Sequence, residues 1–233
     1  TAINIGLIIA GSLCGLAFGR FMKENLKQTL MMVSGIIVLL LGMSGAMQYM
    51  LVIVNGTLQT TGPMLMIISM VAGAVIGELI DLNRWITVFG DWVKAKTGNT
   101  GDPQFTHAFI TASLTFTVGA MGVLGSIQDG LTGNYQTLLL KGILDGIIVM
   151  VMVSSMGKGA LFSFIPVGIT QWIITAMAHI AAPLMTPSAI DNLSYVGSIL
   201  IFCVGIDLIW PGKIRIANLL PAIFVAMGLT FLL

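Results

Sequence analysis

The sequence predicts an all-α fold, a polytopic bundle of about eight transmembrane helices in a single domain covering residues 1–233. Hydrophobic residues make up 57% of the chain and charged residues only 8%, whereas a soluble domain carries about 25% charged residues. The mean hydropathy is +1.02. Apolar runs recur along the chain at about the 20 residues that a helix needs to cross hydrocarbon. Because lipid cannot satisfy free backbone groups, an open sheet is excluded for these runs.

Short polar segments divide the chain into eight predicted spans. They cover residues 3–20, 28–50, 63–81, 105–126, 136–156, 160–182, 193–210 and 215–232. The segment at about 82–98 is more polar, and its Trp85 and Trp92 recur at helical spacing opposite Arg84 and Asp91. This pattern predicts an amphipathic helix that lies at the membrane interface and links the third and fourth spans.

The basic residues predict the orientation of the bundle. Nine of the ten Lys and Arg residues follow odd-numbered spans: Arg20, Lys23, Lys27, Arg84, Lys94, Lys96, Lys158, Lys213 and Arg215. Loops rich in Lys and Arg stay in the cytoplasm. We therefore expect a multi-pass protein of the inner (plasma) membrane with both termini on the extracytoplasmic side. The alternation also supports eight crossings, because one crossing more or fewer would destroy it.

A weak internal repeat pairs the second span with the seventh. Residues 33–43 resemble residues 196–206 without gaps. The offset of five crossings would make 1–81 and 160–233 inverted repeats flanking a central pair at 105–156, a 3+2+3 arrangement. Inverted repeats are a common plan of transporters, whose solute site lies near the midplane between the repeats. Apolar helices also resemble one another by chance, so both interpretations stay open.

The segment 118–133 is unusually rich in glycine, with Gly119, Gly122 and Gly125 at three-residue spacing, followed by Gln128, Asp129 and Gly130. Each glycine costs a helix about 1 kcal/mol relative to alanine. One interpretation is a helix broken at membrane depth, which is tolerated where the backbone lines a wet cavity. The other is an outer loop that carries a glycine-rich packing face.

Two charged residues lie inside the fifth predicted span. Asp145 is about nine residues into it, which at about 1.5 Å per residue places the carboxylate near the midplane. Lys141 is one turn away on the same face. A charge at this depth costs about 2.5–3.5 kcal/mol, so we expect the two side chains to pair, facing the bundle interior. The pair is either a functional site or a structural clasp.

Several classes of function lack support in the sequence. A net charge of +1 disfavours nucleic-acid binding. No nucleotide-binding loop or hydrolase motif is present, and Cys14 and Cys203 are expected to be packing residues. We therefore expect no cofactor, no metal and no enzymatic activity. Small residues at four-residue spacing, Gly11/Gly15/Gly19 and Gly73/Gly77, predict close helix packing, either within one chain or in a homo-oligomer.

Several landmarks resemble the YqgA/YdfK-like family of uncharacterised bacterial integral membrane proteins. They are the run 125–133, Lys141 with Leu144-Asp145, Thr186-Pro187-Ser188, residues 218–222, and the opening Ile3-Asn4. The resemblance covers nearly the whole chain and implies a bacterial inner-membrane location. It implies no substrate or mechanism.

These observations favour a secondary transporter or channel-like permease for a small polar or charged solute or ion. The predicted pathway contains Asp145 and Lys141, with Gln128, Asp129 and the glycine segment beside them. Asn4 and Asn218, from opposite ends of the chain, would complete the site. The alternative is a membrane scaffold that binds partners without transport, whose centre would be dry and tightly filled.

Overall fold

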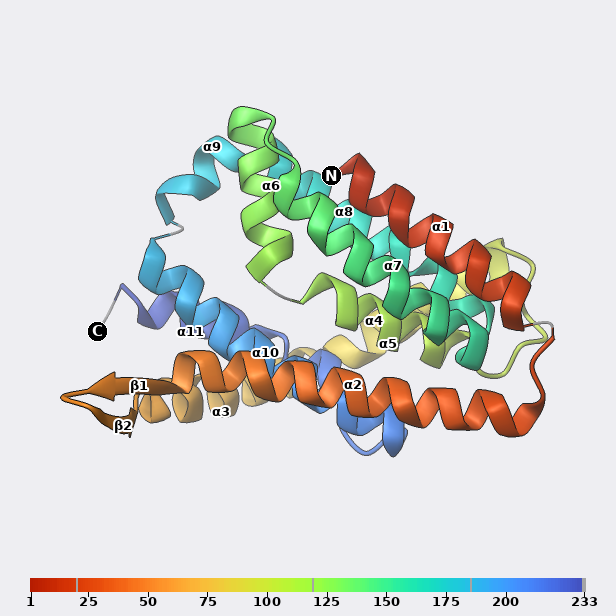
Figure 1. The fold of residues 1–233 in the computed structure, drawn as a ribbon, viewed down its shortest axis with the longest axis horizontal. Helices are drawn as coiled ribbons and strands as arrows, with labels where there is room; N and C mark the ends of the chain where they lie inside the picture. Colours follow the sequence, from red (N-terminus) through yellow and green to blue (C-terminus); the bar gives the residue numbers. More distant parts are fainter. Residues whose placement is uncertain (20, 119, 185, 232–233) are drawn as a thin grey trace.

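The computed structural model describes residues 1–19, 21–118, 120–184 and 186–231, and it is built mainly from helices (Figure 1). The elements are α1 (Ala2–Gly19), α2 (Glu24–Met50), β1 (Leu51–Val54), β2 (Thr57–Thr60), α3 (Pro63–Ile80), α4 (Leu82–Lys96), α5 (Phe105–Thr117), α6 (Ala120–Thr132), α7 (Gln136–Met156), η1 (Lys158–Ser163), α8 (Phe164–Ala176), α9 (Ala178–Ala181), η2 (Ala182–Leu184), α10 (Pro187–Ile209), η3 (Ile216–Leu219) and α11 (Pro221–Leu229).

Six helical segments in the described part of the chain are long and apolar enough to cross a membrane: α1, α2, α3, α7, η1 with α8, and α10. A seventh crossing results if the bent pair α5–α6 counts as one span. The last predicted span, 215–232, is a shorter apolar helix over Ile216–Leu229. The all-α membrane architecture is therefore confirmed with six to seven candidate spans. The predicted linker at 82–98 is also helical, as α4.

The fourth predicted span differs from the expected 105–126. The axes of Phe105–Thr117 and Met121–Thr132 differ by 61°. The break lies between Thr117 and Met121. Gly119, a predicted site residue, lies outside the described residues. Val118, just before it, has the extended backbone angles φ −78° and ψ 123°.

Beyond this break, the glycine-rich segment forms a regular helix, α6, from Ala120 to Thr132 despite the helix cost of its glycines. Its glycines are used for packing. A Cβ at Gly125 would lie 2.8 Å from the Leu138 side chain, and one at Gly130 would collide with the Thr175 carbonyl oxygen. Close packing against α7 and α8 offsets the low helix propensity.

A β-hairpin after α2 was not predicted. Strands β1 and β2 pair antiparallel with Leu51 opposite Thr60. The two turn residues are Asn55 at φ 51° and Gly56 at φ 78°, and an Asn-Gly pair with both φ angles positive is the preferred two-residue hairpin turn. The Asn55-Gly56 pair is therefore a hairpin signal that is local in the sequence. It lies in the loop between the predicted spans 28–50 and 63–81.

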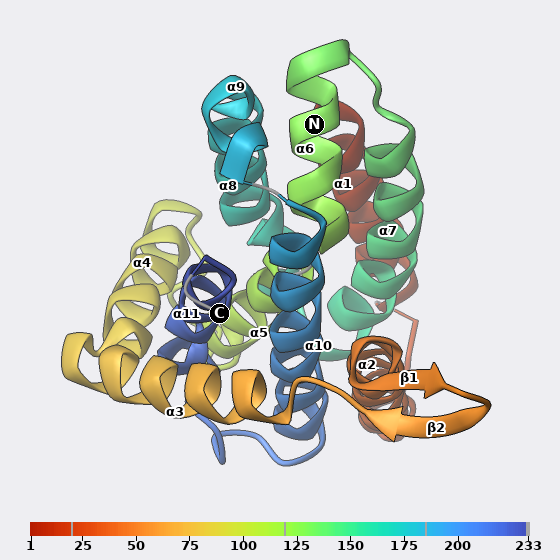
Figure 2. The same ribbon diagram turned by 90° about the vertical axis from the view of Figure 1, so that its left-hand side faces the viewer.

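Long helices pack side by side in pairs (Figures 1 and 2), and glycines lie at their contacts. Helix α1 runs parallel to α7, with Gly11 against the backbone of Gly146 and Gly15 against Met150. Helix α3 packs antiparallel on α11, where Gly73 meets Ala222. In the described part of the chain, Gly11, Gly15, Gly73 and Gly77 therefore pack against helices of the same chain.

We expect Gly11→Leu to lower the free energy of unfolding by about 1–3 kcal/mol, because overpacking of this size forces the helices apart. Any Cβ at position 11 would collide with the Gly146 carbonyl oxygen. Gly6→Leu on the same helix is the matched control, because a Cβ there meets no described atom within 4 Å. Unfolding by SDS in mixed micelles would measure both. Equal stability of the two variants would contradict the packing role of Gly11.

Candidate functional site

The centre of the site is an ion pair on α7. Lys141 donates to Asp145 Oδ2 one helical turn away. The two side chains are only 8% and 10% exposed. The predicted pairing of these two residues is therefore present, and both face the bundle interior.

The broken helix contributes a backbone acceptor to this pair. Lys141 Nζ donates to the carbonyl oxygen of Phe116, at 2.9 Å. Phe116 belongs to the last turn of α5, where helix carbonyls have no partner within the helix. Such a helix end carries a partial negative charge that stabilises a cation, whereas the N-terminus of α6, just beyond the break, carries a partial positive charge.

A cavity of about 340 Å³ reaches the ion pair. Residues of α2, α5, α6, α7 and α10 line it, together with Val118 at the break. Its polar lining comes from Lys141, Asp145, Gln48, Tyr49, Thr115, Ser194 and Ser198. The remaining wall is largely apolar and includes Val38, Leu41, Ile148 and Ile201. The cavity is therefore mostly apolar, with its charged part at Lys141 and Asp145 and further polar side chains on α2, α5 and α10.

Two buried amides lie next to the ion pair. The Asn4 amide faces Gly142 and lies beside Asp145, but neither of its polar atoms makes a hydrogen bond of normal geometry with any described residue. Gln171 of α8 lies, like the stem of Lys141, against Gly122. Its side-chain nitrogen and oxygen are likewise without a partner in the described part of the chain. Buried polar groups are normally hydrogen-bonded, so these two amides require an explanation.

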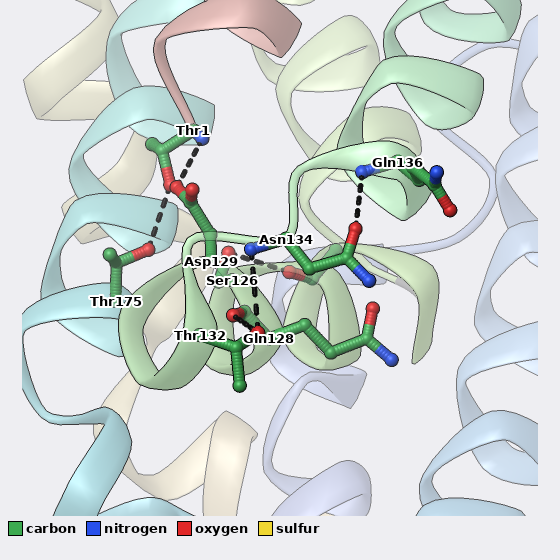
Figure 3. A network of polar contacts seen from close by, with 9 residues as sticks. Thr1, Ser126, Gln128, Asp129, Thr132, Asn134, Gln136 and Thr175 are labelled. Carbon is green, nitrogen blue, oxygen red and sulfur yellow. Dashed lines mark hydrogen bonds and ion pairs between the residues drawn. The ribbon is translucent and has the colours of Figure 1, made fainter.

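Asp129, further along α6, belongs to a separate polar network with Thr1 and Thr175 (Figure 3). The backbone nitrogen of Thr1 donates to its carboxylate at 2.5 Å, and the Thr1 hydroxyl is 2.7 Å from that of Thr175 on α8. Thr175 is one turn from Gln171. A polar strip therefore runs between α1, α6 and α8 from Asp129 towards the ion pair.

The other predicted site residues are dispersed. Gln128 is exposed and accepts a hydrogen bond from Thr137 at 2.7 Å. Its side chain points away from that of Asp129 (Figure 3). Asn218 is buried near α3, where its Oδ1 accepts from the Asn83 backbone at 2.6 Å. The structure therefore brings together Lys141, Asp145, Asn4 and Gly122, but not Gln128 or Asn218.

A second cavity, of about 440 Å³, lies along α5 at His107, Thr111 and Leu114. His107 is 3.3 Å from Asp207 of α10, which also accepts from the Gly212 backbone at 2.8 Å. Arg215, which pairs with Glu78, lines the same cavity. Among the residues that the structure describes, no three His, Cys, Asp or Glu side chains form a group that could hold a metal ion.

Several residues of the site were not predicted from the sequence. Gln171 was recognisable as a lone amide in an apolar span, but the second cavity depends on contacts between α5 and α10 that no local pattern reveals. The cavity-lining Ser194 and Ser198 look like ordinary small residues. Both satisfy the rule that small polar residues are common on membrane helices, so nothing local distinguishes them.

The fold and the buried charges define a multi-span helical membrane protein with a polar site inside the bundle. The chain belongs to a family of proteins of unknown function, DUF554, whose model matches residues 1–231. The family membership agrees with the resemblance inferred from the sequence landmarks.

Two relatives match over nearly their full length. One is the uncharacterised membrane protein YdfK of Bacillus subtilis, 27% identical over 234 residues that cover 100% of this chain and 96% of the relative. The other is the uncharacterised protein YqgA of Escherichia coli, 24% identical over 236 residues that cover 98% and 94% of the two chains. No solved structure matches the chain.

Proposed function

We propose that this protein is a secondary transporter or channel-like permease that moves a small polar or charged solute across the bacterial inner membrane. The observation that supports it most is the cavity that reaches Lys141 and Asp145 beside a broken helix. Ionisable residues inside a membrane are costly, and they commonly mark the path of a solute or ion. Helices broken at membrane depth are also typical of transporter sites.

The competing proposal, a scaffold without transport, calls for a dry and filled centre. A cavity of about 340 Å³ at the ion pair argues against it. The glycine faces that a scaffold would use for assembly are occupied by α7 and α11 of the same chain. Both observations favour a permease.

We also propose that the chain contains the inverted repeat predicted from its sequence. The packing of α2 on α10 supports this proposal. Residues 33–43 and 196–206 are related by a shift of 163 positions. Gly42 contacts Phe202, and its counterpart Gly205 contacts Leu39, the counterpart of Phe202. If a pseudo-two-fold axis relates the two segments, then replacing both residues of a contact by their counterparts should give another observed contact, as it does here. The packing of α1 on α7 and of α8 on α6 fits the same axis.

The relative directions of the packed helices support eight alternating crossings. Parallel packing of α1 on α7 fits two outside-to-inside spans, and antiparallel packing of α2 on α10 and of α3 on α11 fits opposite directions. With the basic loops in the cytoplasm, both termini are extracytoplasmic. The cavity at His107 and Asp207 then opens towards the cytoplasmic end.

A flux assay tests the permease proposal. Purified protein is reconstituted into liposomes, and uptake of ¹⁴C-labelled alanine, lactate, alaninamide and lactamide is compared with protein-free vesicles, the membrane potential being held at zero by valinomycin and equal K⁺. We expect at least one probe to enter faster with protein. Asp145→Asn should reduce that rate several-fold, because the site loses its carboxylate charge.

Two results would count against this proposal. Uptake of all four probes at the protein-free rate would overturn the permease function for small solutes of this kind. Faster uptake that survives in both Asp145→Asn and Lys141→Met would leave a permease but remove the site from Lys141 and Asp145.

A further inference from the structure

The charges around the central cavity balance. Of the residues that line it, Lys141 and Asp145 are the charged ones, and they carry one charge of each sign. A site for an anion or for a cation would instead be expected to present an excess of the opposite charge. Any solute that enters must also compete with the existing bond between Lys141 and Asp145.

The broken helix adds a second pair of opposite partial charges. The last carbonyls of α5 form a negative end, of which Phe116 already accepts from Lys141, and the first amides of α6 form a positive end. Gln171, a buried amide with no partner among the described residues, lies against Gly122 in the first turn of α6. The end of α6 is therefore accompanied by an unused donor and acceptor.

We infer that the solute is a small zwitterion of the amino-acid type, with its carboxylate bound by Lys141 and the α6 end and its ammonium group bound by Asp145 and the Phe116 carbonyl. This inference rests on the proposed permease function. The zwitterion replaces the internal ion pair by two ion pairs of the same kind, so no buried charge is left without a partner. An anion or cation would leave one charge uncompensated, which costs several kcal/mol in a buried site.

The size and walls of the cavity fit this class. About 340 Å³ lies at the lower end of the range for ligand pockets, roughly 300–1,000 Å³. The apolar part of the wall, with Leu41 and Ile148, would hold a short aliphatic side chain, while the Ser194 and Ser198 hydroxyls lie on α10 across the space. The site is thus polar where the charged groups bind and apolar where a side chain would point.

The four probes of the flux assay separate charge from size. Alanine, lactate, alaninamide and lactamide each have six non-hydrogen atoms and share one carbon skeleton, but they are zwitterionic, anionic, cationic and neutral near pH 6.5. We expect alanine to enter about tenfold faster than each of the others, the equivalent of about 1.4 kcal/mol. Thermal stabilisation of the purified protein by each probe gives a second readout that needs no transport, and alanine should raise the unfolding temperature most.

The double variant Lys141→Met/Asp145→Asn removes both charges together and is the matched control. It should lose the preference for alanine in both assays. Faster uptake of lactate or alaninamide than of alanine would overturn the zwitterion inference and leave the permease standing. Equal rates and equal stabilisation for all four probes would overturn it as well. Uptake of none of them would overturn the permease function for small solutes of this kind, and the zwitterion inference with it.

Discussion

Lys141→Met is expected to lower the free energy of unfolding by about 3–5 kcal/mol, because it leaves the Asp145 carboxylate buried without its partner. Asp145 is only 10% exposed, and Lys141 is the cation that contacts it. The Phe116 carbonyl loses its donor in the same variant. Reversible unfolding in bicelles or SDS mixed micelles, followed by circular dichroism, would measure the loss.

The double variant Lys141→Met/Asp145→Asn should regain much of this stability, because neither charge remains. Replacing both members of a buried ion pair together often leaves the free energy of unfolding nearly unchanged. Lys158→Met, at an exposed position of η1, is the control and should change stability by less than about 0.5 kcal/mol. If Lys141→Met is as stable as this control, the pair is not buried in the membrane-embedded protein.

Much of the fold follows from patterns that are local in sequence. Apolar runs define the helices, because the lipid leaves the backbone no alternative to internal hydrogen bonds. The spacing of Gly11, Gly15 and Gly19 predicts a packing face, and the structure places that face on α7. Lys141 and Asp145 are predictable as a pair because a four-residue separation on a helix brings them together.

Features that depend on contacts between distant segments were not predictable in the same way. The glycines of α6 suggested a break within the segment, but whether a glycine breaks a helix or allows close packing depends on its neighbour, here Leu138 for Gly125. Asn218 and Gln171 are both amides in apolar surroundings. Only the tertiary structure shows that Asn218 is bonded to Asn83 and that Gln171 faces Gly122.

Gln171→Met is expected to reduce transport of the preferred probe about tenfold while leaving the protein as stable as the wild type or more so. The Gln171 amide is buried and has no hydrogen-bond partner among the residues described. An unpaired buried amide costs the folded state about 1–3 kcal/mol, and an apolar side chain of similar shape removes that cost. Unfolding experiments and uptake of ¹⁴C-alanine would be measured on the same preparations.

Asn218→Leu is the comparison variant, because the Oδ1 of this buried amide accepts a hydrogen bond from the Asn83 backbone, whereas its Nδ2 has no partner among the described residues. Loss of that hydrogen bond leaves the Asn83 N–H unsatisfied, so we expect a destabilisation of about 1–3 kcal/mol. The two variants therefore separate an amide that stabilises the fold from one that is kept at a cost in stability. If Gln171→Met destabilises the protein as much as Asn218→Leu, or transports at the wild-type rate, then Gln171 does not serve the solute.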